Sequence, residues 1–98
     1  MVLKNRIVKR KSTFCVYILK CADDTLYVGS TNDIERRLHQ HNNAKAGAHY
    51  TKIRRPVAIV YSETCKTLGE SRSREAAIKR LTRAKKLELV ISSEHRYA

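Results

Sequence analysis

The sequence predicts a small α+β domain in which helices cover a three-stranded antiparallel sheet, with the element order β-β-α-β-α-α. The chain has 98 residues, which leaves no room for a second domain of ordinary size. Its first two segments rich in β-branched and aromatic residues flank a short polar turn, as in an antiparallel hairpin. Three short strands alone would leave apolar faces in water, so the segments with helical periodicity must pack on the sheet.

The hairpin strands are predicted over residues 14–20 and 25–29, which are rich in Val, Ile, Leu and Tyr. Residues 22–24, Ala-Asp-Asp, form the turn between them. Residues 57–61, Val-Ala-Ile-Val-Tyr, are predicted as the third strand. Residues 44–55 lack periodicity and carry several basic side chains, which predicts a basic loop before that strand.

The first helix is predicted from Asn32, which can cap it, to about residue 43. Ile34 and Leu38 lie four residues apart and define its apolar stripe. At about 100° per residue, Arg37 and His41 fall together on one flank of that stripe, within reach of the sheet.

Two more helices are predicted near the C-terminus. One starts at Ser71 or Ser73 and runs through Thr82, with Glu75 at the edge of its apolar stripe. The last helix is capped by Thr82 and continues through Ile91. Both helices are amphipathic and are expected to cover the sheet.

The domain is predicted to span residues 14–92, between a basic, flexible N-terminal arm (1–13) and a C-terminal tail (93–98). The arm lacks the apolar run of a secretory signal, and no apolar run is long enough to span a membrane. The three cysteines have no CxxC pair and no zinc-ligand spacing. These features favour a reduced, cytoplasmic location.

The composition indicates a polyanionic partner. Lys and Arg number 21 against 9 Asp and Glu, for a formal net charge of +12. Nucleic acid is the commonest such partner for a small soluble protein. An anionic membrane surface fits less well, because the chain has no Trp and only one Phe to anchor it.

One set of side chains has the composition of a phosphodiester-hydrolysing site. Two phenols, a fixed cation, an imidazole and a carboxylate can activate water, neutralise developing charge and hold a divalent cation. These side chains are Tyr17, Tyr27, Arg37, His41 and Glu75. Spacing alone also permits an ordinary interpretation, in which the tyrosines pack across strands and the charges are solvated or paired.

These residues resemble the GIY-YIG nuclease family. Residues 15–17, Cys-Val-Tyr, stand where the family has Gly-Ile-Tyr, and residues 27–29, Tyr-Val-Gly, stand where it has Tyr-Ile-Gly. The resemblance covers about residues 14–92 and is greatest to the small single-domain bacterial branch often labelled YhbQ-like. Residues 47–51 and 83–86 also have counterparts in that branch.

The resemblance implies a hydrolase that cuts DNA phosphodiesters with one Mg²⁺ or Mn²⁺. Glu75 would hold the ion, and Tyr17 would take a proton from the attacking water. Tyr27 would position water or phosphate, and Arg37 would stabilise the transition state. His41 would accept a proton from a tyrosine.

Other positions extend or depart from this pattern. Gly29 would let the backbone turn closely beside the site without a side chain that blocks substrate. Cys15 replaces the first glycine of the pattern, and no Asn follows Glu75, although some family members place one there. An unperturbed tyrosine costs roughly 4 kcal/mol to hold as phenolate at pH 7, so Tyr17 is expected to need help from Arg37, His41, the ion and the protein's positive field.

The function predicted is a metal-dependent DNA endonuclease linked to DNA repair or recombination. Low sequence specificity is expected, because 98 residues leave little surface for base reading. Branched DNA and single-stranded regions are the candidate substrates. Four loop residues are expected to contact the phosphate backbone or stack on an unpaired base: Tyr50, Lys52, Arg54 and Arg55. The alternatives are a catalytically weak or inactive nucleic-acid-binding module of the same fold and a basic RNA-associated protein. The absence of an Asn after Glu75 favours the first of these alternatives.

Overall fold

The computed structural model describes residues 14–43 and 49–96. Three strands form one antiparallel sheet in the order β3-β2-β4, so that β2 is the central strand. The strands are β2 (Phe14–Cys21), β3 (Leu26–Thr31) and β4 (Val57–Cys65). The expected N-terminal arm lies outside the described residues.

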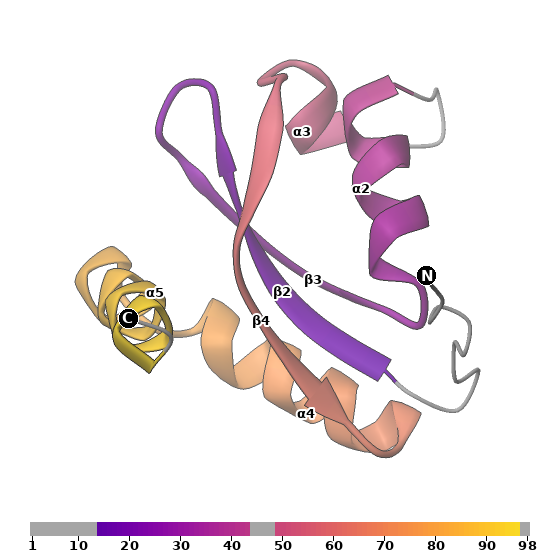
Figure 1. Cartoon of the computed structure of the whole chain (residues 1–98), viewed down its shortest axis with the longest axis vertical. Coiled ribbons are helices and arrows are strands. Elements are labelled where there is room, and N and C mark those ends of the chain that lie inside the picture. The colour runs from indigo at the N-terminus through magenta and orange to yellow at the C-terminus, as the bar shows by residue number, and fades with distance from the viewer. Residues whose placement is uncertain (1–13, 44–48, 97–98) are drawn as a thin grey trace.

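Helices cover both faces of this sheet (Figure 1). α2 (Ile34–Asn43) and the short α3 (His49–Lys52) lie on one side, and α4 (Leu68–Lys79) and α5 (Arg83–Arg96) lie on the other. The predicted fold class and element order are confirmed, with α3 added inside the segment expected to be a loop. In the part of the chain that the structure describes, no helix is long and apolar enough to cross a membrane.

Alternation of side chains along β2 divides the core in two. Ile18 is buried in a cluster that includes Ile78 of α4 and Val90 of α5. Tyr17 points to the opposite face, where its cluster includes Leu38 of α2. Tyr17 on β2 therefore faces α2 and points away from α4.

The N-terminus of α2 differs from the prediction by one residue. Asp33, and not Asn32, is the N-cap, because its Oδ1 accepts a hydrogen bond of 3.1 Å from the Arg36 N–H. β3 continues to Thr31, whose Oγ1 accepts a 3.0 Å bond from the Asp33 N–H. Asp and Asn cap helices equally well, so the longer strand decides which of the two residues does so.

The predicted start of α4 at Ser71 or Ser73 is too late. Thr67 caps the helix, and its Oγ1 accepts a 3.0 Å bond from the Glu70 N–H. The first turn is polar and contains Gly69, so it carries no apolar stripe that a periodicity argument could detect. β4 likewise extends to Cys65, four residues beyond the predicted strand.

The boundary between the last two helices is confirmed at Thr82, whose Oγ1 accepts a 3.2 Å bond from the Lys85 N–H at the start of α5. α4 ends at Lys79, earlier than predicted, with Arg80 as its C-cap. α5 runs to Arg96, so it extends into the segment expected to be a tail.

Candidate active site

Tyr17 and His41 form the buried centre of the candidate site. Tyr17 is 2% exposed and His41 is fully buried. A hydrogen bond of 2.9 Å joins the Tyr17 hydroxyl to Nε2 of His41, and the two rings meet edge to face. The predicted flank of α2 therefore does reach the sheet, and it places an imidazole directly on the phenol.

The second tyrosine lies against the same imidazole. The Tyr27 ring packs edge to face on His41, with 5.1 Å between ring centroids. Tyr50 of α3 follows, 5.9 Å from Tyr27 and tilted by 32°. Aromatic rings thus lead from the buried Tyr17–His41 pair to Tyr50, which is 36% exposed.

Thr51 is a site residue that sequence reasoning missed. It is fully buried on α3, and its Oγ1 lies 2.7 Å from Nδ1 of His41. The only signal in the sequence is its place in residues 47–51, which have counterparts in the YhbQ-like branch. A threonine in an apparently irregular basic segment gives no periodicity that would predict its burial.

Burial raises the pKa of Tyr17 to about 12, and it outweighs the hydrogen bond and positive charge of Arg37, which lower that pKa. The charges of Tyr27 and Glu75 raise it further. The net shift is opposite in direction to the one expected from the protein's positive field, because desolvation acts more strongly than distant charge. At pH 7 a phenolate at this position would cost roughly 7 kcal/mol, so Tyr17 is a neutral phenol.

The same burial acts on His41 in the opposite direction. It lowers the pKa of His41 to about 4, and the nearby charges of Arg37 and Arg55 lower it as well. His41 is therefore neutral at pH 7 and has one N–H and one free lone pair. It can accept a proton, as the family resemblance implies.

Acid is expected to destabilise the fold through His41. The pKa of His41 falls from 6.5 in the unfolded chain to about 4 in the fold. The stabilisation is complete above pH 6.5 and is lost as the pH falls toward 4, where the unfolded chain alone binds a proton. Between pH 7.5 and pH 4.5 the wild type should lose about 2.5 kcal/mol of unfolding free energy more than His41→Gln, measured by urea unfolding. Equal losses in both proteins would contradict the assignment.

Arg37 and its neighbour Arg36 occupy different environments. Arg36 is exposed, whereas Arg37 is half-buried, and its positive charge lowers the pKa of Tyr17. The Arg37 guanidinium also donates to the Gln40 side-chain oxygen at 2.9 Å. Arg37 is thus a cation held beside the phenol.

Gly29 lies directly opposite Tyr17 in the β2–β3 register. A Cβ at Gly29 would lie 2.6 Å from the Tyr17 hydroxyl oxygen and 2.7 Å from Cζ. Its φ is not in the left-handed region, so the expectation of a special backbone turn is wrong. Gly29 is required because the Tyr17 ring rests on its backbone.

Gly29→Ala is therefore expected to displace Tyr17 from His41. A rigid buried ring cannot move without strain, so the protein should lose about 1–3 kcal/mol of stability. Any activity that depends on Tyr17 should fall about 100-fold, because catalysis is sensitive to ångström displacements. Gly69→Ala is the matched control, since the nearest atom to a Cβ there is at 3.9 Å. Thermal unfolding of both variants separates them, and equal stability would contradict the steric argument.

Glu75 approaches the site from the opposite layer. It lies on α4, and its carboxylate accepts a 2.7 Å hydrogen bond from the Ser30 hydroxyl on the edge strand β3. Lys79 forms an ion pair with it at 2.9 Å. The Glu75 charge makes a small contribution to the raised pKa of Tyr17.

Glu75 remains ionised over the physiological pH range. Burial alone would raise its pKa, but hydrogen bonds from Ser30 and Lys79 and the charges of Lys79 and Arg72 outweigh burial and lower it. The described residues contain no cluster of three or more His, Cys, Asp or Glu side chains that could hold a metal. A single ionised carboxylate nevertheless fits Mg²⁺, which takes one or two carboxylates and completes its shell with water and substrate phosphates.

The predicted nucleic-acid-binding residues occupy different environments. The Arg54 guanidinium stacks 4.0 Å from the Tyr50 ring centroid and pairs with Asp23 at 3.0 Å. Lys52 is exposed. Arg55 instead donates to the backbone carbonyls of His41, at 2.6 Å, and Gln40, at 3.3 Å, so its described contacts hold the end of α2.

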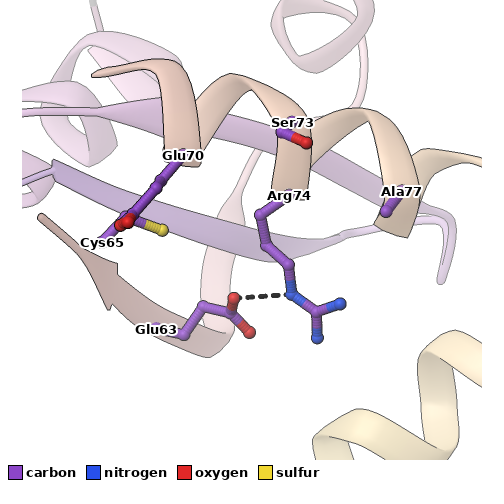
Figure 2. Close-up of a pocket in the computed structure, with 6 residues that line it drawn as sticks. All are labelled: Glu63, Cys65, Glu70, Ser73, Arg74 and Ala77. Carbon is purple, nitrogen blue, oxygen red and sulfur yellow. Dashed lines mark hydrogen bonds and ion pairs between the residues drawn. The ribbon is translucent and has the colours of Figure 1, made fainter. Parts of the chain in front are cut away.

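A hollow between β4 and α4 contains none of the predicted site residues. Figure 2 shows Arg74 of α4 extending to Glu63 of β4, and a 2.7 Å ion pair joins the two. The Tyr61 hydroxyl also donates to Glu63. The Glu63 carboxylate in this hollow is thus satisfied by Arg74 and Tyr61.

A comparison with protein-family models now decides the family. Residues 13–88 match the model described as the GIY-YIG catalytic domain. The chain belongs to the GIY-YIG family. This is a nuclease family that acts on DNA, and the two tripeptides of its pattern lie on β2 and β3, where Tyr17 and Gly29 face each other.

Relatives of this GIY-YIG chain are small bacterial proteins named UPF0213. One from Desulfotalea psychrophila is 52% identical over 79 residues, which cover 81% of this chain and 72% of the relative. One from Syntrophus aciditrophicus is 51% identical over 81 residues, covering 83% and 93% of the two chains. Neither name states an activity.

Two solution NMR structures resemble this GIY-YIG fold. A UPF0213 protein from Bacillus halodurans aligns with a TM-score of 0.52 and 37% identity, over 80% of this chain and 82% of the other. A protein from E. faecalis aligns with a TM-score of 0.60 and 35% identity, over 88% and 91%. The sheet and its covering helices are therefore shared with solved relatives.

Proposed function

We propose that this GIY-YIG domain is a divalent-metal-dependent DNA endonuclease of low sequence specificity. The observation that carries the proposal is the buried hydrogen bond between the Tyr17 hydroxyl and neutral His41, with Arg37 beside it. The Tyr17 ring also lies against the backbone of Gly29, and the positive charge of Arg37 acts on its hydroxyl.

The pair is suited to a concerted proton relay. With a pKa of about 12 for Tyr17 and about 4 for His41, a separated phenolate–imidazolium pair would lie roughly 11 kcal/mol above the neutral pair, before their mutual attraction. The phenol therefore does not ionise first. Its oxygen takes a proton from the attacking water while its own proton passes to His41, and the water oxygen bonds to phosphorus as the leaving P–O bond breaks.

Three other side chains support the displacement. Arg37 stabilises charge that develops on the phosphoryl oxygens, because a fixed cation in a dry site acts more strongly than one in water. Tyr27 is half-buried between His41 and Tyr50 and positions water or phosphate at the mouth of the site. Glu75 would hold the Mg²⁺ or Mn²⁺ ion, which supplies electrostatic stabilisation of the leaving oxygen when bound.

Substrate binding rests on charge more than on base contacts. The net charge of +12 favours any nucleic acid backbone, and each neutralised phosphate adds roughly 0.9 to the salt dependence of binding. Tyr50 and Arg54, stacked at the exposed end of the aromatic series, offer a surface for an unpaired base. Branched DNA and single-stranded regions are thus the proposed substrates, and a role in repair or recombination stays a prediction.

Cleavage of supercoiled plasmid and of branched duplexes tests the proposal. With Mg²⁺ or Mn²⁺ the full chain should nick one strand per encounter, and excess chelator should abolish product. Competition of labelled DNA by structured RNA at fixed salt distinguishes an RNA-binding protein. DNA binding without metal-dependent product would overturn the nuclease proposal and leave a binding module of the same fold.

A further inference from the structure

Thr51 has no role in the function proposed above. It is fully buried on α3, and its Oγ1 is 2.7 Å from Nδ1 of His41. The other ring nitrogen, Nε2, is 2.9 Å from the Tyr17 hydroxyl. His41 therefore lies between two hydroxyl groups, each of which can donate or accept.

Only one of the two hydroxyls can donate to His41. Neutral imidazole carries one N–H, so one hydroxyl must donate to His41 and the other must accept from it. A phenol is a stronger acid than an alcohol hydroxyl, so Tyr17 is the stronger donor and Thr51 the better acceptor of the two. The Tyr17 proton is therefore directed to Nε2 of His41, 2.9 Å away. The imidazole proton then resides on Nδ1 and points to Thr51.

We propose that Thr51 is a positioning residue that holds His41 in the Nδ1–H tautomer, so that the Nε2 lone pair faces Tyr17. The hydrogen bond at one ring nitrogen determines which nitrogen is protonated. The opposite tautomer would place an N–H against the phenol oxygen, and Tyr17 could no longer pass its proton to His41. The catalytic consequence rests on the proposed function, whereas the tautomer does not.

The surrounding backbone supports this role. The Arg54 N–H donates to the Thr51 carbonyl at 3.0 Å and closes the turn that carries the threonine. Arg55 donates to the His41 carbonyl at 2.6 Å. The segment after α3 therefore fixes the backbone of His41, and Thr51 contacts its ring. Together these contacts keep the Thr51 hydroxyl within hydrogen-bonding distance of the imidazole.

The test uses ¹⁵N-labelled full chain and long-range ¹H–¹⁵N correlation spectra of the histidine rings, with His41→Gln to assign the His41 signals. Wild type should show a protonated Nδ1 and an unprotonated Nε2. Thr51→Val preserves shape but cannot accept the bond, and it should shift His41 toward the Nε2–H form. Thr51→Ser retains the hydroxyl and should keep the wild-type signals.

Kinetics give the second measurement. Thr51→Val should lower kcat for DNA cleavage by about 10- to 100-fold, the scale on which supporting hydrogen-bond partners act, with KM for DNA unchanged. Thr51→Ser should restore kcat to near the wild-type value. An Nε2–H tautomer in wild type, or a folded Thr51→Val with unchanged tautomer and kcat, would overturn the proposal. If wild type cleaves no DNA, the proposed function fails, but the tautomer of His41 in wild type still tests the role of Thr51. That measurement needs no variant, so it holds even if Thr51→Val does not fold.

Discussion

Tyr17→Phe is expected to reduce kcat for DNA cleavage by about 10²- to 10⁴-fold, the usual contribution of a group that transfers a proton in the transition state. The substitution removes one oxygen atom and keeps the ring that rests on Gly29. DNA affinity should stay within about twofold, because this hydroxyl is buried and phosphate binding depends on surface charge. Initial rates of plasmid nicking and a binding isotherm at the same salt measure both quantities.

Tyr61→Phe is the matched control for this variant. Tyr61 is also a buried tyrosine of the sheet, but it lies in the cluster that faces α4 and α5, and its hydroxyl donates to Glu63. The Tyr61→Phe variant should cleave DNA at the wild-type rate. Tyr17→Phe leaves Nε2 of His41 without its partner and should cost about 1–3 kcal/mol of stability, so rates are compared well below the melting temperature. Full activity in a folded Tyr17→Phe protein would exclude the proton relay.

Glu75→Gln is expected to lower cleavage by at least about 100-fold at a fixed metal concentration, with partial recovery as Mg²⁺ or Mn²⁺ is raised. The amide keeps the size of the side chain and can still accept from Ser30, but it has no charge to hold a cation. The effect on stability should be small, because the ion pair with the exposed Lys79 is worth less than about 1 kcal/mol. A metal titration of the nicking rate measures the change.

Glu70→Gln serves as the control on the same helix. Glu70 is exposed on α4, and its carboxylate accepts from the Lys66 N–H, which an amide oxygen can also do. Its metal dependence should match that of wild type. If Glu70→Gln and Glu75→Gln reduce cleavage equally, loss of negative charge on α4 in general, and not a metal ligand, explains the effect.

Some errors of sequence-based prediction have local causes. Asn32 and Asp33 are both good helix caps, and only the length of β3 selects Asp33. The first turn of α4 contains Gly69 and Glu70 and has no apolar stripe, so its start could not be found from periodicity. In both cases local preference permits several boundaries, and strand pairing or packing selects one.

The prediction for Gly29 shows a second kind of limit. A glycine after two strand residues suggests a backbone requirement, and the sequence contains no information on which side chain crosses it. The register of β2 and β3 places it opposite Tyr17, and the steric demand comes from that ring. Gly29 is thus important because strand pairing places it against the Tyr17 ring.

The sequence alone determined the class of fold, the helix flank that carries Arg37 and His41, and a charge suited to a polyanion, because periodicity and composition are local properties. Tertiary structure alone decided that burial raises the pKa of Tyr17, and that Thr51 completes the contacts of His41. It also decided that Glu75, on the opposite layer from α2, accepts a hydrogen bond from Ser30 on the edge strand β3. Desolvation and contacts between distant segments exist only after the chain has packed, so they leave no pattern in the sequence.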